Sequence, residues 1–157
     1  MAISPECRVV VSVPNFLGGQ HSALLDFILS RERNFHAATV AQGSSRAINE
    51  AVRRATILDS LGAFESFFVD RLKEQLAPAL IQLGHAEFAL GRIEVQATAS
   101  NHGDYFRLHQ DGGADATREI SFVYFLHAEP RRFSGGELRI CQTRLIDGRL
   151  KIGRAHV

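Results

Sequence analysis

The feature that most constrains this chain is a histidine and an aspartate two residues apart, lying between glycine-containing turns. His109 and Asp111 follow the turn residues 102–104 and precede the pair Gly112-Gly113. If residues 106–111 are extended, side chains two positions apart leave the same face of the strand. The imidazole and the carboxylate could then bind one cation together, with other coordination positions left open. The pattern therefore favours a metal site on a short strand.

The residues around this pair carry more information than the pair itself. With seven His and seven Asp in 157 residues, a His-x-Asp pair arises by composition in roughly one of three such chains. The order of the surrounding segments is more specific. A Gly-Asp-aromatic approach leads into the pair, a loop of small residues follows it, and an arginine-led apolar segment at 118–126 precedes Pro130 and Ser134-Gly135-Gly136-Glu137-Leu138-Arg139-Ile140.

This order resembles the prolyl 4-hydroxylase-like branch of the 2-oxoglutarate and iron(II)-dependent oxygenases. The resemblance is best from Ile93 to Asp147 and looser from Val9 to Leu90. It implies an α+β fold, in which N-terminal helices pack on one sheet of a double-stranded β-helix of the jelly-roll or cupin kind. It also implies a dioxygenase that hydroxylates a C–H bond, with a prolyl residue of a peptide as the family-based expectation and small molecules as open alternatives.

The resemblance also implies the cofactors and their ligands. His109 and Asp111 would hold iron(II), and 2-oxoglutarate would be the co-substrate, with ascorbate as a further candidate cofactor. Relatives often carry a tyrosine near the motif that contacts the co-substrate, and Tyr105 and Tyr124 are the two tyrosines of this chain. The residues Phe125-Leu126-His127 stand where the family usually has Tyr-Leu-Asn, so a hydroxyl and an amide are missing from the expected places.

Gln96 belongs to a segment of alternating polarity, residues 91–100, in which Ile93, Val95, Ala97 and Ala99 alternate with polar residues. This alternation predicts a strand with one apolar and one polar face. The polar face, with Gln96 and Thr98, either lines the pocket of the site or faces solvent.

A complete member of the family needs a distal histidine ligand and a basic residue shortly after it. The histidine nearest the end of the chain is His156, in Gly153-Arg154-Ala155-His156-Val157. No apolar-aromatic strand precedes it and no basic residue follows it. We therefore expect the third ligand to be absent or to be His156, the C-terminal strands of the β-helix to be incomplete, and the chain to end before the distal histidine. Such a chain could itself be inactive.

Two other readings remain open. A cupin-like module could bind a metal or another ligand without oxidising anything, with His102 or His127 as its third ligand. A non-catalytic fragment could instead pair its exposed sheet edge with a partner chain.

Composition narrows the class of protein. A length of 157 residues with 45% hydrophobic and 22% charged residues suits one domain, residues 1–157, with a sizeable core. A net charge of +1 gives no bulk attraction to nucleic acid or anionic membranes. Cys7 and Cys141 lie far apart, and the N-terminus has no signal-peptide pattern, so we expect a cytoplasmic protein. The oligomeric state stays undetermined.

Periodicity predicts the remaining elements. Strands are expected at 8–13, 35–40, 105–109 and 118–126, the last of them buried, with a loop at 42–45 and a helix at 21–32. The pattern at 46–58 is helical but ambiguous, with Arg53 and Arg54 facing solvent.

The longest periodic segment, residues 61–83, predicts a helix that breaks at Pro78 and ends at Gly84, with its phenylalanines packed on a sheet. Asp147-Gly148 predicts a hairpin between residues 143–146 and 149–152.

Overall fold

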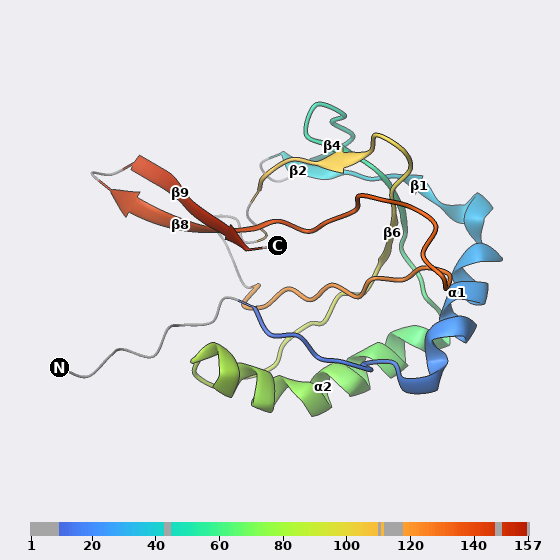
Figure 1. Ribbon diagram of the computed structural model, residues 1–157, viewed down its shortest axis with the longest axis horizontal. Helices are drawn as coiled ribbons and strands as arrows, with labels where there is room; N and C mark the ends of the chain where they lie inside the picture. The colour runs from blue at the N-terminus through green and yellow to red at the C-terminus, as the bar shows by residue number, and fades with distance from the viewer. Residues whose placement is uncertain (1–9, 43–44, 110, 112–117, 147–148, 157) are drawn as a thin grey trace.

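The computed structural model describes residues 10–42, 45–109, 111, 118–146 and 149–156 of the 157-residue chain. The helical elements are, in chain order, η1 (Gly18–Gln20), α1 (His21–Leu29), η2 (Glu32–Asn34) and α2 (Ala63–Leu83). The strands are β1 (His36–Ala37), β2 (Val40–Gln42), β3 (Ser45–Ala47), β4 (Arg53–Arg54), β5 (Thr56–Leu58), β6 (Ala97–Ala99), β7 (Tyr105–Phe106), β8 (Ile140–Ile146) and β9 (Arg149–His156). In Figure 1, α2 lies below the strands and α1 flanks one end of them.

The long helix α2 forms where the three-and-four-residue apolar repeat predicts it. The Glu65 carboxylate accepts hydrogen bonds from the Leu61 amide at 2.7 Å and the Ser60 hydroxyl at 2.9 Å, next to the first turn. Gly84 closes the helix in the left-handed conformation, with φ of 64°, and the His85 amide donates to the Leu80 carbonyl at 3.0 Å. The predicted end at Gly84 is therefore confirmed.

The predicted break at Pro78 is wrong, because α2 continues through it. A proline in a helix removes one backbone hydrogen bond. Pro78 is exposed, and Leu80 beyond it is 2% exposed. Burial of Leu80 keeps the last turns docked on the protein, so tertiary packing outweighs the lost hydrogen bond.

The strands form small antiparallel sheets. β5 lies between β1 and β6 in a three-stranded sheet, while β2 pairs with β3, β4 with β7, and β8 with β9. The last pairing, with Ile146 opposite Arg149, confirms the predicted hairpin, whose turn residues 147 and 148 lie outside the described residues. Figure 1 shows this hairpin projecting away from the helices.

The helical pattern at 46–58 is wrong, since this segment supplies β4, β5 and part of β3. β5 contains Thr56 and Ile57, whose branched side chains suit a strand, and it has strands on both sides to pair with. The expected exposure of Arg53 is also wrong, because this residue is 8% exposed. Its neighbour Arg54 is exposed as expected, with 49% of its side chain accessible.

The hydrophobic core lies where the two helices meet β5. Its buried members come from the turn after Pro14, from both helices, from the end of β5 and from the connection between β5 and α2: Phe16, Leu17, Leu24, Leu58, Leu61 and Phe68. The Phe68 ring lies 5.8 Å from the Phe16 ring and 6.1 Å from the Tyr124 ring, measured between centroids. The core thus ties α2 to the segment that follows the candidate metal pair.

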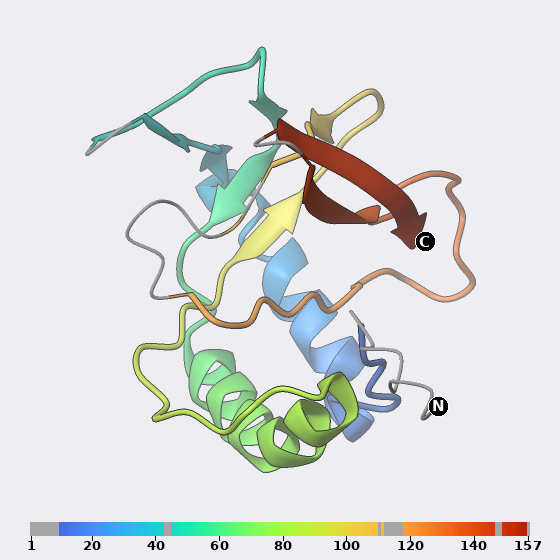
Figure 2. The same ribbon diagram turned by 90° about the vertical axis from the view of Figure 1, so that its left-hand side faces the viewer.

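Five predicted strands are shorter than expected or not formed. The strands predicted at 35–40 and 105–109 are regular only in β1 with the first residue of β2, and in β7. Residues 10–13 and 118–126 form no regular strand, and the segment 91–100 is regular only in β6. Residues 10–13 and 118–126 have no ladder partner among the described residues, whereas β6 pairs with β5. Burial of 118–126 is also only partial, because Val123 is 57% and Phe125 56% exposed, whereas Tyr124 and Leu126 pack on the core. In Figure 2 this segment, coloured orange, runs between α2 and the strands.

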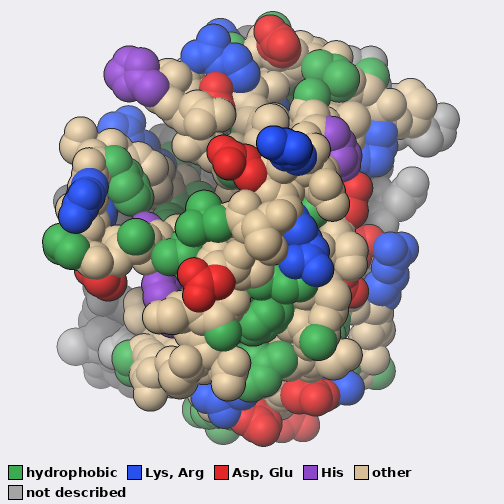
Figure 3. Space-filling view, turned by 90° about the vertical axis from the view of Figure 1, so that its right-hand side faces the viewer, with side chains coloured by type: hydrophobic (Ala, Val, Ile, Leu, Met, Phe, Trp, Pro, Cys, Tyr) green, Lys and Arg blue, Asp and Glu red, His purple; other side chains and the backbone are tan. Residues whose placement is uncertain are grey.

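The architecture is therefore mixed α and β with antiparallel pairing, which is compatible with a double-stranded β-helix. Within the described ranges, no helix is long and apolar enough to span a bilayer. Figure 3 shows the face on the side of α1, where acidic and basic side chains are interspersed around hydrophobic ones. This mixture agrees with the net charge of +1.

A histidine on β1 makes the stability of the β1–β5 pairing depend on pH. The Nε2 of His36 lies 2.7 Å from the Asp59 carboxylate, and this hydrogen bond raises the pKa of His36 above its usual value of 6.5. A raised pKa means that the bond stabilises the fold fully below the unfolded-state pKa and is lost as pH rises through the folded-state pKa.

We expect the urea midpoint of the wild type to fall slightly across that interval. Asp59→Asn should remove this part of the pH dependence, and equal pH slopes for the two proteins would contradict the assignment.

Candidate metal centre

His109 and Asp111 come together just beyond β7. Their Nε2 and Oδ1 atoms are 3.2 Å apart, and the side chains are 37% and 44% exposed. β7 is anchored on β4, and the Arg107 amide donates to the Val52 carbonyl at 2.9 Å to continue the pairing. The chain bends at Leu108, so the two side chains meet without the uninterrupted strand that the sequence predicts.

The tautomer of His109 follows from its other ring nitrogen. Nδ1 lies 2.7 Å from the Arg107 carbonyl oxygen, which can only accept, so Nδ1 carries the hydrogen. In the neutral ring, Nε2 then presents its lone pair to the Asp111 carboxylate. Two electron-rich atoms 3.2 Å apart require a positive centre between them, either a proton on Nε2 or a metal ion. A carbonyl on Nδ1 is the usual arrangement for a metal-binding histidine.

The separation of the two atoms also suits neighbouring positions on one ion. Two ligand atoms each about 2.1 Å from an ion and at right angles to one another are about 3.0 Å apart. The observed 3.2 Å needs little adjustment to reach this value. Imidazole and carboxylate together suit iron, manganese or zinc.

Neighbouring side chains hold Asp111 in place. The Ser121 hydroxyl donates to Oδ2, the carboxylate oxygen that does not face His109. Arg118 donates to the Asp111 backbone carbonyl at 3.4 Å and lies 3.4 Å from the Glu94 carboxylate. The segment 118–121 therefore orients the carboxylate, although it is not a regular strand.

Ser121→Ala is expected to weaken metal binding about tenfold, because partners that orient a ligand contribute roughly 10–100-fold to affinity. The measurement is anaerobic calorimetric titration with iron(II). Ser134→Ala, which removes an exposed hydroxyl from a loop elsewhere, is the matched control. Equal affinities for both variants would show that the Ser121 contact does not support the carboxylate.

The described residues bring only two of the candidate ligands, His109 and Asp111, together. Among them, no group of three or more His, Cys, Asp or Glu side chains could hold one ion. His102 is exposed in the turn before β7, and His127 lies 3.4 Å from Glu129. His156 ends β9 opposite Ile140, and the position of its side chain lies outside what the structure describes.

The two tyrosines lie away from the pair. Tyr105 stands opposite Arg54 in the β4–β7 ladder, and its hydroxyl donates to the Glu50 carbonyl at 2.5 Å. Strand alternation places its neighbour Phe106 on the other face of β7, and it is Phe106 that stacks on His109. The Tyr124 hydroxyl lies 2.6 Å from Nδ1 of His21, and burial raises the pKa of Tyr124.

Gln96 is exposed, whereas Thr98, on the same predicted polar face, accepts a hydrogen bond from Arg53 at 3.2 Å. Three residues next to the pair were not predicted from the sequence to belong to the site: Arg53, Phe106 and Ser121. The spacing of three residues between Phe106 and His109 would place them on opposite faces of an uninterrupted strand, so the bend at Leu108, which the sequence does not predict, is what allows them to stack. The burial of Arg53 has no signal in the sequence.

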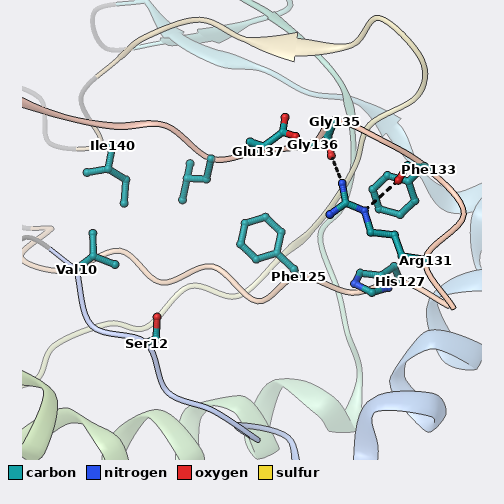
Figure 4. Close-up of a pocket in the computed structure, with 11 residues that line it drawn as sticks. Val10, Ser12, Phe125, His127, Arg131, Phe133, Gly135, Gly136, Glu137 and Ile140 are labelled. Atoms are coloured by element: carbon teal, nitrogen blue, oxygen red, sulfur yellow. Dashed lines mark hydrogen bonds between the residues drawn. The ribbon is translucent and has the colours of Figure 1, made fainter. Parts of the chain in front are cut away.

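A separate hollow of about 440 Å³ lies between residues 10–12, 125–133 and 135–140. Figure 4 shows Phe125 beneath the segment that carries Glu137, and Arg131 donating to the carbonyls of Phe133 at 3.0 Å and Gly135 at 2.7 Å. Neither His109 nor Asp111 is among its lining residues. Val10, Phe125 and Ile140 give the hollow a largely apolar lining. It is therefore separate from the candidate metal centre formed by His109 and Asp111.

Comparison with known proteins gives one informative similarity. The chain is 34% identical over 142 residues to a Synechocystis protein named as an uncharacterized PKHD-type hydroxylase. The match takes in 83% of this chain and 46% of that relative, so the chain spans less than half of the relative's length. No family model and no solved structure matches the chain.

Proposed function

We propose that this chain carries part of the active site of an iron(II)- and 2-oxoglutarate-dependent hydroxylase of the prolyl 4-hydroxylase-like family, built on a double-stranded β-helix. The observation that carries the proposal is the approach of His109 Nε2 to Asp111 Oδ1 at 3.2 Å, with Nδ1 bonded to a carbonyl. The similarity to a protein named as a PKHD-type hydroxylase supports the same conclusion independently of the geometry.

Each residue of the centre has a definite task in this proposal. His109 would give its Nε2 lone pair to the ion, and Asp111 would give one carboxylate oxygen and partly neutralise the charge. Ser121 would keep the second oxygen turned away from the ion. When bound, iron(II) with 2-oxoglutarate supplies the activation of dioxygen that hydroxylates a C–H bond, leaving succinate and carbon dioxide.

The open side of the centre suits an incoming substrate. Both ligand side chains keep more than a third of their surface exposed, and Leu108 beside them is 58% exposed. A partly apolar, partly open approach is compatible with a peptide or small-molecule substrate whose C–H bond must come close to the ion. We propose a prolyl residue of a peptide as the first substrate to test.

The test is the formation of succinate from 2-oxoglutarate in air with iron(II), ascorbate and a proline-containing peptide. The proposal predicts succinate formation that requires iron and is lost in Asp111→Ala, with hydroxylated peptide as the second product.

Iron binding with no succinate formed under any of these conditions would contradict the hydroxylase and favour a metal-binding module of the cupin kind. We keep this second candidate function because the described residues bring only two candidate ligands together, which a simple metal-binding module also fits.

A further inference from the structure

We infer that Arg53 is a positioning residue that fixes the imidazole of His109 through the ring of Phe106. The inference rests on the proposed role of His109 as a metal ligand. Arg53 lies on β4, more than fifty residues before the metal pair, and within the described part of the chain no hydrogen bond or ion pair joins it to His109 or Asp111. It acts on the site through one intervening aromatic ring.

The environment of Arg53 is unusual for a guanidinium. The residue is 8% exposed, and its Nε is buried without a hydrogen-bond partner among the described residues. Its one hydrogen bond to a described residue goes from Nη2 to the Thr98 hydroxyl at 3.2 Å. Burying a charged group without a paired acid is costly, so such a residue needs compensating contacts.

The main compensating contact is the face of Phe106. Arg53 stands directly opposite Phe106 in the β4–β7 ladder, and its guanidinium carbon lies 4.7 Å from the ring centroid. A cation over an aromatic face is attracted by the ring quadrupole, and the attraction grows when water is excluded. The hydrogen bond to Thr98 on β6 fixes the other side of the guanidinium. Arg53 therefore holds Phe106 in one orientation.

Phe106 passes this orientation on to His109. The two rings are stacked, with centroids 3.5 Å apart and planes 16° from parallel. The stack sets the plane of the imidazole, and the bond from Nδ1 to the Arg107 carbonyl sets its rotation within that plane. Together these contacts aim Nε2 at Asp111. Losing Arg53 frees Phe106 and removes one of the two constraints on the ligand.

The electrostatic surroundings agree with this placement. Burial lowers the pKa of Arg53, nearby Arg46 lowers it further, and Asp111 opposes both effects. The carboxylate of the metal pair is thus among the charges that the buried guanidinium senses. Arg53 therefore lies close enough to Asp111 for the two charges to interact.

The adjacent residue provides a matched control. Arg54 is on the same strand but on the opposite face, where it bonds to Asp104 at 2.9 Å and to the Gly103 carbonyl. Its guanidinium carbon lies 5.5 Å from the Tyr105 ring, whereas the ring stacked on His109 is that of Phe106. Arg54→Gln removes the same charge one residue away without touching the Phe106–His109 stack.

The experiment uses Arg53→Gln, Phe106→Leu, the double variant and Arg54→Gln. The first readout is the chemical shift of the His109 ring protons in the metal-free protein at fixed pH, which reports stacking on Phe106. We expect Arg53→Gln to move this shift toward its unstacked value and Arg54→Gln to leave it unchanged. The second readout is iron(II) affinity, expected to fall about tenfold in Arg53→Gln.

The double variant tests the route of action. If Arg53 acts through the ring, Arg53→Gln has little further effect in the Phe106→Leu background. If the fold losses of iron(II) affinity in the two single variants multiply in the double variant, the inference is overturned. An unchanged His109 shift in Arg53→Gln overturns it as well.

Should Arg53→Gln not fold, Arg53→Lys keeps the charge but lacks the planar fork. Arg53→Lys must then move the His109 ring shift part of the way toward its value in Phe106→Leu, and no change overturns the inference. The His109 ring shift is measured without metal, so it tests the role of Arg53 even if the wild type forms no succinate. Failure of the proposed function and failure of this inference therefore give different results.

Discussion

His109→Ala is expected to lower the iron(II) affinity of the protein by at least about 100-fold, because it removes one of the two proposed ligands that the described structure brings together. Asp111→Ala is expected to have a similar effect, since the remaining imidazole alone holds a divalent ion weakly. The measurement is anaerobic calorimetric titration of the wild type and of each variant with iron(II).

His102→Ala is the control for both substitutions. His102 lies seven residues before His109, is exposed in the turn before β7, and makes no contact with the pair. It is also, with His127, one of the alternative third ligands that the sequence left open. We expect wild-type affinity for His102→Ala. A loss equal to that of His109→Ala would assign the site to a different ligand set.

Phe68→Ala is expected to lower the free energy of unfolding by about 3–5 kcal/mol, the usual cost of deleting a buried aromatic ring. Phe68 is 3% exposed and lies within about 6 Å, ring to ring, of Phe16, Phe122 and Tyr124. It therefore joins α2 to the turn before α1 and to the segment that carries Ser121. The measurement is urea unfolding followed by circular dichroism.

The comparison variant is Phe133→Ala, whose ring is 54% exposed. Substitutions at exposed positions usually change stability by less than about 0.5 kcal/mol. A loss in Phe68→Ala no larger than in Phe133→Ala would mean that the aromatic cluster does not hold the helix on the protein.

The sequence predicted the elements that depend on local pattern. Both α1 and α2 carry apolar residues at helical spacing, and both helices form. The turn at Asp147-Gly148 predicted the β8–β9 hairpin correctly for the same reason. The segment 46–58 was predicted wrongly because its strands depend on partners distant in the chain, β6 and β7, which no local pattern reveals.

In the candidate site, too, the contacts set by local spacing could be predicted and those from distant segments could not. The approach of His109 to Asp111 could be expected from their spacing, because neighbouring positions of one short segment decide it. The supporting contacts come from elsewhere in the chain: Ser121 from the segment after the loop, and Arg53 from β4. Tyr105 illustrates the limit: strand alternation would place Tyr105 on the same face as His109, but the chain bends at Leu108 and it is Phe106 that stacks on His109.

The central claim is that His109 and Asp111 hold a divalent ion to which 2-oxoglutarate can bind. Its most direct test is the visible absorption of the protein after anaerobic addition of iron(II) and then 2-oxoglutarate. The claim predicts a weak charge-transfer band in the wild type and in His102→Ala, and none in His109→Ala or Asp111→Ala. No band in the wild type, or an undiminished band in either ligand variant, would contradict it.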